Sequence, residues 1–304
     1  MRLAGGSSDS VILKSIVLPD PDPSRDADHR SHPRGWGGRR SDTRKRRSYQ
    51  IECEFYRRWA SACGAECRVA KPIAIESDHG GHRLLLEDLD AAGFPRRVHQ
   101  PTRSEIGDGL GWLAHFHATF LGVEPEGLWP RGTYWHLDTR PDEWSAMPDG
   151  HPLKDSAERL DAALRQPTPQ TLLHGDAKLG NFCFGSPRHG SAAIAAVDFQ
   201  YVGGGCGMSD VAYFLGSCMM DDELRPLETQ WLDEYFERFA AAASRRGHSP
   251  KRVKQTCERW RELFPVAWAD FTRFLVGWSP GHQKLTPYSE ELTERAFQVL
   301  DRLG

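Results

Sequence analysis

The chain has 304 residues and a formal net charge of −3 at pH 7, and its hydrophobic and charged shares are 39% and 27%. These values are ordinary for a globular protein with a large core, and they give no general case for nucleic-acid binding. No apolar run reaches the length of a membrane span, and no signal peptide is visible. We therefore expect neither a nucleic acid nor a membrane as a partner.

The cysteines indicate a compartment. Seven cysteines, an odd number, are scattered along the chain, as expected of free thiols in a reducing cytoplasm. Cys63 and Cys67 stand four apart without a matching second pair, which argues against a zinc site. We expect a cytoplasmic protein, and the sequence indicates no oligomeric state.

Two segments of different character open the chain. Residues 10–18 are mostly apolar and β-branched, which predicts a strand that carries Lys14. Residues 19–48 hold four prolines, several aspartates and a basic cluster at 44–47, so we expect a disordered loop. The basic cluster could instead be a targeting signal or a patch for an anionic surface.

A helix is predicted next, over 49–63. Ile51, Phe55 and Trp59 recur at the spacing of one helix face, and Glu52 and Glu54 lie on the same helix. Strands are predicted over 69–75 and 83–86, and the second runs into Glu87-Asp88-Leu89. The pattern breaks at 91–95, so we divide the chain near Asp90 into regions 1–89 and 90–304.

The second region is predicted to be mostly helical. Helices are expected over 105–121, 155–164, 229–243, 251–264, 266–276 and 289–303, and a hairpin joins 182–184 to 194–197. Several aromatic residues could line a cage for an ammonium ligand beside Asp270, although core packing is the usual role of helical aromatics. They are Trp231, Tyr235, Trp260, Trp268 and Trp278.

The stretch 172–181 carries the strongest signal for chemistry. A hydrophobic pair leads into His174-Gly175-Asp176, and Asn181 follows the aspartate by five positions. This is the spacing of the catalytic loop in kinases, with Gly in place of Arg. An aspartate at this place accepts the proton of an attacking hydroxyl, and the asparagine holds a magnesium ion. Lys178 can reach the phosphoryl group that is transferred.

A second carboxylate follows a short apolar run. Residues 193–197 predict a strand that ends in Asp198-Phe199-Gln200. A kinase needs a carboxylate there to bind magnesium between the phosphates. The pair of motifs makes a chance arrangement of polar residues much less plausible.

These motifs, together with Ser209-Asp210 and the apolar residues after it, resemble the small-molecule branch of the kinase-like fold. That branch includes aminoglycoside phosphotransferases, choline kinases and ecdysteroid-kinase-like (CHK-type) proteins, and Gln200 favours the last group. The resemblance implies an α+β, bilobal protein-kinase-like fold with a small antiparallel N-lobe and a larger, mostly helical C-lobe. It further implies that Asp176 is the base, that Asn181 and Asp198 bind magnesium, and that Asp210 braces the catalytic loop.

The resemblance also assigns roles to the N-lobe. Lys14 would contact the nucleotide phosphates and pair with Glu52, since the family pattern places this glutamate three residues before a Phe-Tyr pair. Glu54 would then be a surface residue. Alternatively, Lys14 is an exposed lysine on an edge strand. The backbone of Glu87, Asp88 and Leu89 would form the hinge that binds adenine.

One departure from the pattern concerns the phosphates. A kinase N-lobe places a Gly-rich loop before the lysine strand, whereas thirteen residues precede Lys14 and offer only Gly5-Gly6. The N-lobe is thus apparently truncated, because the chain starts late or because the protein lacks this cover.

The sequence favours one function over an alternative. We expect an ATP- and Mg²⁺-dependent kinase that phosphorylates a hydroxyl of a small molecule, because no Ala-Pro-Glu segment typical of protein kinases follows Asp198. The alternative is a non-catalytic pseudokinase or ligand-binding module. The acceptor and the choice between ATP and GTP cannot be read from the sequence.

Overall fold

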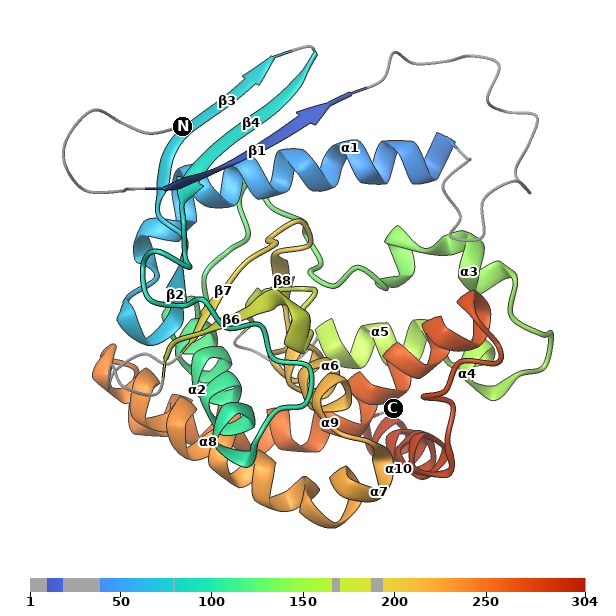
Figure 1. The fold of residues 1–304 in the computed structure, drawn as a ribbon. Helices are drawn as coiled ribbons and strands as arrows, with labels where there is room; N and C mark the ends of the chain where they lie inside the picture. The colour runs from blue at the N-terminus through green and yellow to red at the C-terminus, as the bar shows by residue number, and fades with distance from the viewer. Residues whose placement is uncertain (1–9, 19–38, 79, 166–169, 187–193, 304) are drawn as a thin grey trace.

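The computed structural model describes residues 10–18, 39–78, 80–165, 170–186 and 194–303. A three-stranded antiparallel sheet of order β1-β4-β3 covers one side of the fold, and α1 runs beneath it (Figure 1). Its strands are β1 (Val11–Val17), β3 (Pro72–Asp78) and β4 (Gly81–Glu87). The architecture is α+β, with a small antiparallel sheet near the N-terminus and a larger, mostly helical remainder, as the sequence predicted. Gly5-Gly6 lies outside the described residues.

The β1 strand lies at an edge of this sheet. It pairs with β4 in a register that sets Lys14 opposite Leu84. Side chains alternate along β1, so Lys14 and Ile16 are half-buried while Leu13 and Val17 are 60% and 81% exposed. The strand expected over 10–18 is confirmed, and its alternation turns the Lys14 side chain toward the interior.

The helix α1 (Arg39–Glu54) begins ten residues earlier than the predicted helix. The prediction of a loop over 19–48 was therefore wrong for 39–48, and 19–38 lies outside the described residues. Partners distant in sequence order this polar stretch: Arg44 Nη1 donates to Thr139 O at 2.9 Å, and Ser48 Oγ donates to Gln200 Oε1 at 3.2 Å. The chain continues from α1 through η2 (Phe55–Trp59), η3 (Ala60–Ala62) and η4 (Ala65–Cys67).

The strand predicted over 69–75 is divided between two sheets. β2 (Arg68–Val69) pairs in parallel with β7 (Ile194–Ala196), whereas β3 begins at Pro72 in the N-terminal sheet. The predicted hairpin is confirmed, because β6 (Phe182–Phe184) pairs antiparallel to β7. The turn expected at 187–190 lies outside the described residues. A further pair joins β5 (Thr171–Leu173) to β8 (Gly203–Gly205).

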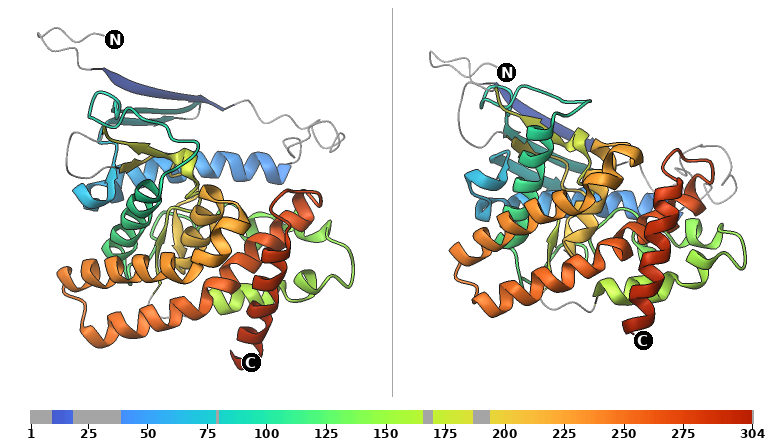
Figure 2. Two further views of the ribbon diagram at one scale, coloured as in Figure 1. Left: turned by 60° about the horizontal axis from the view of Figure 1, so that its bottom comes forward. Right: turned by 90° about the horizontal axis from the view of Figure 1, so that it is seen from below.

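The remaining elements are helices, most of them on the side of the molecule away from the N-terminal sheet (Figure 2). The two helices predicted over 251–276 are one helix, α9, which continues through Pro265. The helices are α2 (Arg103–Thr119), η5 (Leu137–Thr139), α3 (Pro141–Ser145), α4 (Pro152–Asp155), α5 (Ala157–Arg165), η6 (Leu179–Asn181), α6 (Met208–Cys218), α7 (Asp221–Leu224), η7 (Arg225–Leu227), α8 (Glu228–Arg245), α9 (Pro250–Trp278) and α10 (Pro287–Leu303).

Aromatic side chains fill the core. The Trp112 and Phe116 rings stack at 4.9 Å, and Phe55 stacks on Phe199 at 3.9 Å, which joins the α1–η2 segment to the Asp198-Phe199 motif. Four of the five aromatics considered for an ammonium cage are core residues with at most 4% exposure. They are Trp231, Tyr235, Trp260 and Trp268.

In the part of the chain that the structure describes, no helix combines the length and the apolar character that crossing a lipid bilayer demands.

Gly81→Ala should destabilise the protein by roughly 1–3 kcal/mol, since only glycine readily adopts its backbone conformation. Gly81 has φ +154°, and an added Cβ would lie 1.9 Å from Ile16 O in β1. Urea unfolding of the purified variant measures the change. Gly281→Ala is the matched control, because no atom lies within 4 Å of its added Cβ. Equal stabilities of the two variants would contradict the expectation.

Candidate active site

A tight turn after β5 delivers the catalytic-loop motif. Gly175 has φ +80°, and a Cβ there would lie 2.0 Å from Tyr201 O, so the position requires glycine. The next residue, Asp176, is 7% exposed, and its N–H donates to His174 Nδ1 at 3.3 Å. The Gly that stands where protein kinases have Arg therefore has a steric cause in this chain.

The two carboxylate oxygens of Asp176 have different surroundings. Oδ2 accepts hydrogen bonds from Lys178 Nζ at 2.8 Å and Asn181 Nδ2 at 3.0 Å. Oδ1 is buried and has no hydrogen-bond partner among the described residues. Burial raises the pKa of the Asp176 carboxyl, although Lys178 opposes the rise, and the charge of Asp198 adds to it. One oxygen is thus anchored, and the carboxylate also interacts with the Tyr213 hydroxyl.

Asn181 directly precedes β6 and Asp198 follows β7, so both lie at the same end of the β6–β7 hairpin. Both hydrogen bonds described for the Asn181 side chain use Nδ2, which also donates to Asp176 O at 2.7 Å. Its Oδ1 is therefore the atom that could reach a cation. Asp198 has φ +70°, an uncommon conformation for a residue with a Cβ, and its Oδ1 is buried without a hydrogen-bond partner in the described structure.

The predicted ion pair between β1 and α1 is confirmed. Lys14 Nζ lies 2.6 Å from Glu52 Oε2, and Glu52 is 2% exposed. Burial raises the pKa of the Glu52 carboxyl, and Lys14 opposes that rise. Glu54 instead pairs with Arg58 at 3.0 Å, as the predicted register requires. Lys14 Nζ also lies 3.9 Å from Asp198 Oδ1, so the lysine connects the helix to the second carboxylate.

Asp210 braces the catalytic loop, as predicted. Its oxygens accept hydrogen bonds from His174 N at 2.6 Å and Gly175 N at 3.0 Å, and Oδ2 lies 3.2 Å from His117 Nε2. The side chain of Asp210 is fully buried. Three partners therefore satisfy a carboxylate that would otherwise be costly to bury.

The predicted hinge follows β4. The Glu87 side chain accepts from Lys71 N at 3.0 Å, and Asp88 Oδ2 accepts from Ser10 Oγ at 2.5 Å. Asp88 O and Leu89 O accept from the N–H groups of residues 92 and 94. Among the described residues none accepts a hydrogen bond from the Leu89 N–H. Local structure thus engages the Glu87 and Asp88 side chains and leaves the Leu89 N–H without a described acceptor.

Sequence reasoning missed residues that surround Asp176. Tyr134 and Tyr213 have their hydroxyl oxygens 3.3 Å apart, and Asp176 adds to the rise that burial causes in the pKa of both hydroxyls. Tyr134 comes from a stretch without periodicity, so no pattern located it. Gln200 was noted for its identity, but its contact with Ser48 was not foreseen because no helix was expected there.

A partly buried lysine–glutamate pair, an aspartate loop with an asparagine five residues on, and a second aspartate after a strand together define a kinase-type phosphotransferase site. The chain belongs to the phosphotransferase enzyme family, whose family model matches residues 30–253. No curated protein matches the chain.

Solved structures of phosphotransferases are similar to the chain at low identity. The aminoglycoside phosphotransferase APH(3'')-Id from Streptomyces rimosus, in complex with ADP and streptomycin, is 16% identical with a TM-score of 0.43, covering 84% of this chain and 87% of its own. The choline kinase LicA from Streptococcus pneumoniae is 16% identical with a TM-score of 0.38, covering 77% and 75%. The GDP complex of wild-type aminoglycoside 2'-phosphotransferase-IIIa is 11% identical with a TM-score of 0.42, covering 86% and 84%.

Asp210→Ala should lower the free energy of unfolding by about 3–5 kcal/mol, because it leaves two backbone donors and His117 without their buried acceptor. Chemical denaturation measures the loss. Asp301→Ala, which removes a carboxylate that is 72% exposed, should change stability by less than about 0.5 kcal/mol. A small effect at Asp210 would mean that the loop holds its shape without this carboxylate.

Proposed function

We propose that this protein transfers the γ-phosphoryl group of ATP to a hydroxyl of a small molecule, in a reaction that requires Mg²⁺. The observation that carries the proposal is that Asp176 Oδ1 and Asp198 Oδ1 are buried carboxylate oxygens without a hydrogen-bond partner among the described residues. Buried polar atoms are normally hydrogen-bonded, so these two oxygens favour a ligand that completes them. All seven cysteines are free thiols, which supports the expected cytoplasmic location.

The residues present fit a magnesium ion. Mg²⁺ prefers oxygen ligands and is commonly held by one or two carboxylates together with substrate phosphates. Asp198 offers its orphan oxygen and Asn181 offers its amide Oδ1. Magnesium held there would neutralise negative charge on the phosphates of the nucleotide.

The N-terminal sheet supplies the contacts proposed for the nucleotide. Glu52 fixes the Lys14 ammonium from one side, and the 3.9 Å separation from Asp198 directs it toward the metal-binding carboxylate. An ammonium in this position can bind phosphate oxygens. In the hinge, Glu87, Asp88 and Leu89 would hold adenine through the backbone, with the Leu89 N–H as its donor.

Asp176 is proposed as the base that receives the proton of the acceptor hydroxyl. Lys178 and Asn181 fix Oδ2, so Oδ1 points a free lone pair at the acceptor. The phosphoryl group is largely detached from its leaving oxygen in the transition state, so positioning matters more than basicity. Lys178, whose side chain is 44% exposed, can also reach the transferred phosphoryl group.

Asp198→Ala should abolish Mg²⁺-dependent binding of ATP while the protein remains folded, because the variant lacks the orphan carboxylate proposed as a metal ligand. Calorimetric titration of ATP with and without Mg²⁺ measures the effect. Asp149→Ala, at a carboxylate that is 99% exposed, is the control. Undiminished Mg²⁺-dependent binding by a folded Asp198 variant would remove this residue from the metal site.

Asp176→Asn should reduce turnover by about a hundred- to ten-thousand-fold and spare ATP binding, since the base contacts the acceptor. ADP release in the presence of a screened acceptor measures turnover. Loss of ATP binding would instead make Asp176 a metal ligand. Magnesium-dependent turnover by the parent protein also decides against the alternative of a non-catalytic module.

Asp176→Asn should also change how the stability of the protein depends on pH. The folded pKa of Asp176 is raised above its ordinary value of 3.8, so the folded state holds its proton more tightly than the unfolded state. Stability from this group is present below pH 3.8 and is lost as the pH rises through the folded pKa. The variant with Asn should therefore gain stability relative to the parent between acid and neutral pH. Thermal melting of both proteins across that range checks the sign.

A further inference from the structure

A cluster of aromatic rings, most of them buried, lies beside the proposed base. Tyr213 and Tyr134, whose hydroxyls share a contact near Asp176, continue into Phe271, Phe274 and Trp278, and we call these five residues the aromatic wall. Neighbouring ring centroids lie 5.0 Å apart for Tyr213–Phe271, 5.5 Å for Tyr134–Phe274 and 5.5 Å for Phe274–Trp278. Trp278 is 42% exposed, so the wall extends to solvent.

Cations lie over both ends of the aromatic wall. The Arg140 Cζ lies 5.7 Å from the centre of the Tyr134 ring and 5.4 Å from that of Phe274. The Lys284 Nζ lies 5.7 Å from the centre of the Tyr213 ring and 5.8 Å from that of Phe271. These distances are those of cation–π contacts, which hold the charges against the wall.

A third cation approaches from α1. Arg44 donates to Thr139 O, and burial followed by the charge of Arg140 lowers the pKa of its guanidinium. The Tyr201 hydroxyl and Glu143 act in the opposite direction on Arg44. Two guanidinium groups are therefore close enough to repel each other at this end of the wall.

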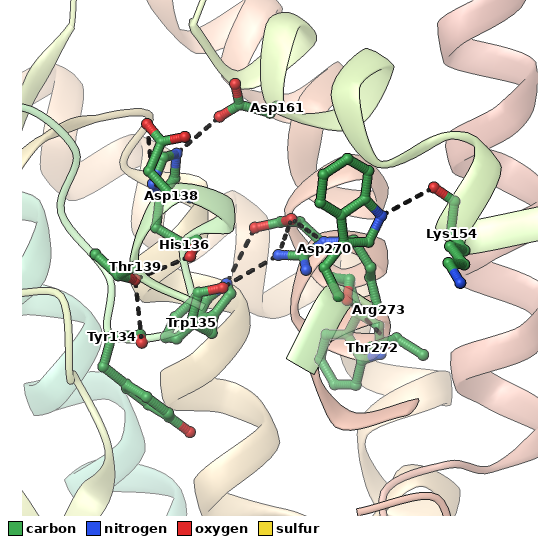
Figure 3. A network of polar contacts seen from close by, with 12 residues as sticks. Tyr134, Trp135, His136, Asp138, Thr139, Lys154, Asp161, Asp270, Thr272 and Arg273 are labelled. Carbon is green, nitrogen blue, oxygen red and sulfur yellow. Dashed lines mark hydrogen bonds and ion pairs between the residues drawn. The ribbon is translucent and has the colours of Figure 1, made fainter. Parts of the chain in front are cut away.

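Few carboxylates balance these charges. Glu143 pairs with Arg140 at 3.0 Å. No described carboxylate lies within ion-pair distance of Arg44 or Lys284, and burial lowers the pKa of the Lys284 ammonium even though Asp221 and Cys218 act against this. Asp270, the acidic residue behind the wall, is already engaged by Arg273 at 2.9 Å and Trp135 at 3.1 Å (Figure 3).

The segment that presents Tyr134 is held in place by its backbone. Thr139 Oγ1 donates to Tyr134 O at 3.4 Å and to His136 O at 2.8 Å, while Arg140 Nε donates to Tyr134 O at 2.8 Å. Figure 3 shows the Tyr134 ring directed away from this network. The network therefore uses backbone groups and fixes the position of the ring, which packs against Tyr213 and Phe274.

We propose that the acceptor is an alcohol that carries a carboxylate or a phosphate on an apolar or aromatic body. Lys284 and Arg140 would bind the anion, and the aromatic wall would bind the body. The inference rests on the proposed function and specifies its substrate class. A polycationic acceptor would meet three cations, while the nearby carboxylates Glu143, Asp270 and Asp176 are already paired, which disfavours its binding.

A set of four alcohols with one skeleton tests the charge preference. The probes are para-(hydroxymethyl)benzoate, its methyl ester, para-(hydroxymethyl)phenyl phosphate and para-(hydroxymethyl)benzylamine. Each is measured for binding by calorimetry and for ADP release with Mg²⁺ and ATP. An anionic probe should exceed the ester by roughly ten- to a hundredfold in affinity or kcat/KM, and the amine should be weakest. The benzoate and phosphate arms identify which anion is preferred.

Substitution at Lys284 tests the assigned residue. Lys284→Met should remove most of the preference for an anionic probe over the ester, and Lys284→Arg should retain it. Lys254→Met is the matched control, since that lysine is 77% exposed on α9. Thermal melting verifies that each variant is folded, and the Arg variant preserves the test if the Met variant is not.

The outcomes separate the two proposals. Three outcomes overturn the inference alone, each observed together with normal Mg²⁺-ATP binding. In these outcomes the protein binds anionic and ester probes equally well, binds none of the probes, or prefers the amine. A charge preference in binding without ATP turnover supports the ligand class and overturns the proposed function. If Lys284→Met loses affinity for the ester and for the anionic probes to the same extent, the role of that lysine is overturned.

Discussion

The site depends on a buried carboxylate that is satisfied from three directions. Asp210 is held by two loop N–H groups and by His117, whose other ring nitrogen lies 2.8 Å from the Tyr235 hydroxyl. These contacts join α6, α2 and α8 to the turn at Gly175. The position of Asp176 therefore follows from packing deep in the helical part.

Negative and positive side chains lie on different sides of Asp176. On the side of the N-terminal sheet, Asp198 and Glu52 surround the Lys14 ammonium. On the acceptor side, Arg140 and Lys284 lie over aromatic rings. Asp176 is between the two and has one anchored and one free oxygen. This arrangement would place the metal ion beside the negative charges of Asp198 and Glu52, and the proposed anionic acceptor beside the positive charges of Arg140 and Lys284.

The sequence predicted the parts of the site whose spacing is set by local chemistry. Asp176 and Asn181 share a short loop, so short-range rules sufficed for them, whereas Glu52 was chosen over Glu54 by the family pattern that places it three residues before Phe55-Tyr56. The helix over 39–48 was missed because contacts with residues far along the chain order it, such as Arg44 with Thr139. Of the aromatic wall, the sequence analysis named Trp278 alone, since Tyr134 comes from a loop without periodicity and the other members come from two helices whose aromatics read as core.

The course of α1 has a consequence for regulation. In protein kinases, the position of the helix that carries the glutamate controls whether the lysine–glutamate pair forms. Here the middle of α1 is tied to the helical part through Arg44 and Ser48, while its last turn carries Glu52 to Lys14. An outward swing of the helix would break all of these contacts together. The lysine–glutamate pair is therefore coupled to the contacts that α1 makes with Thr139 and Gln200.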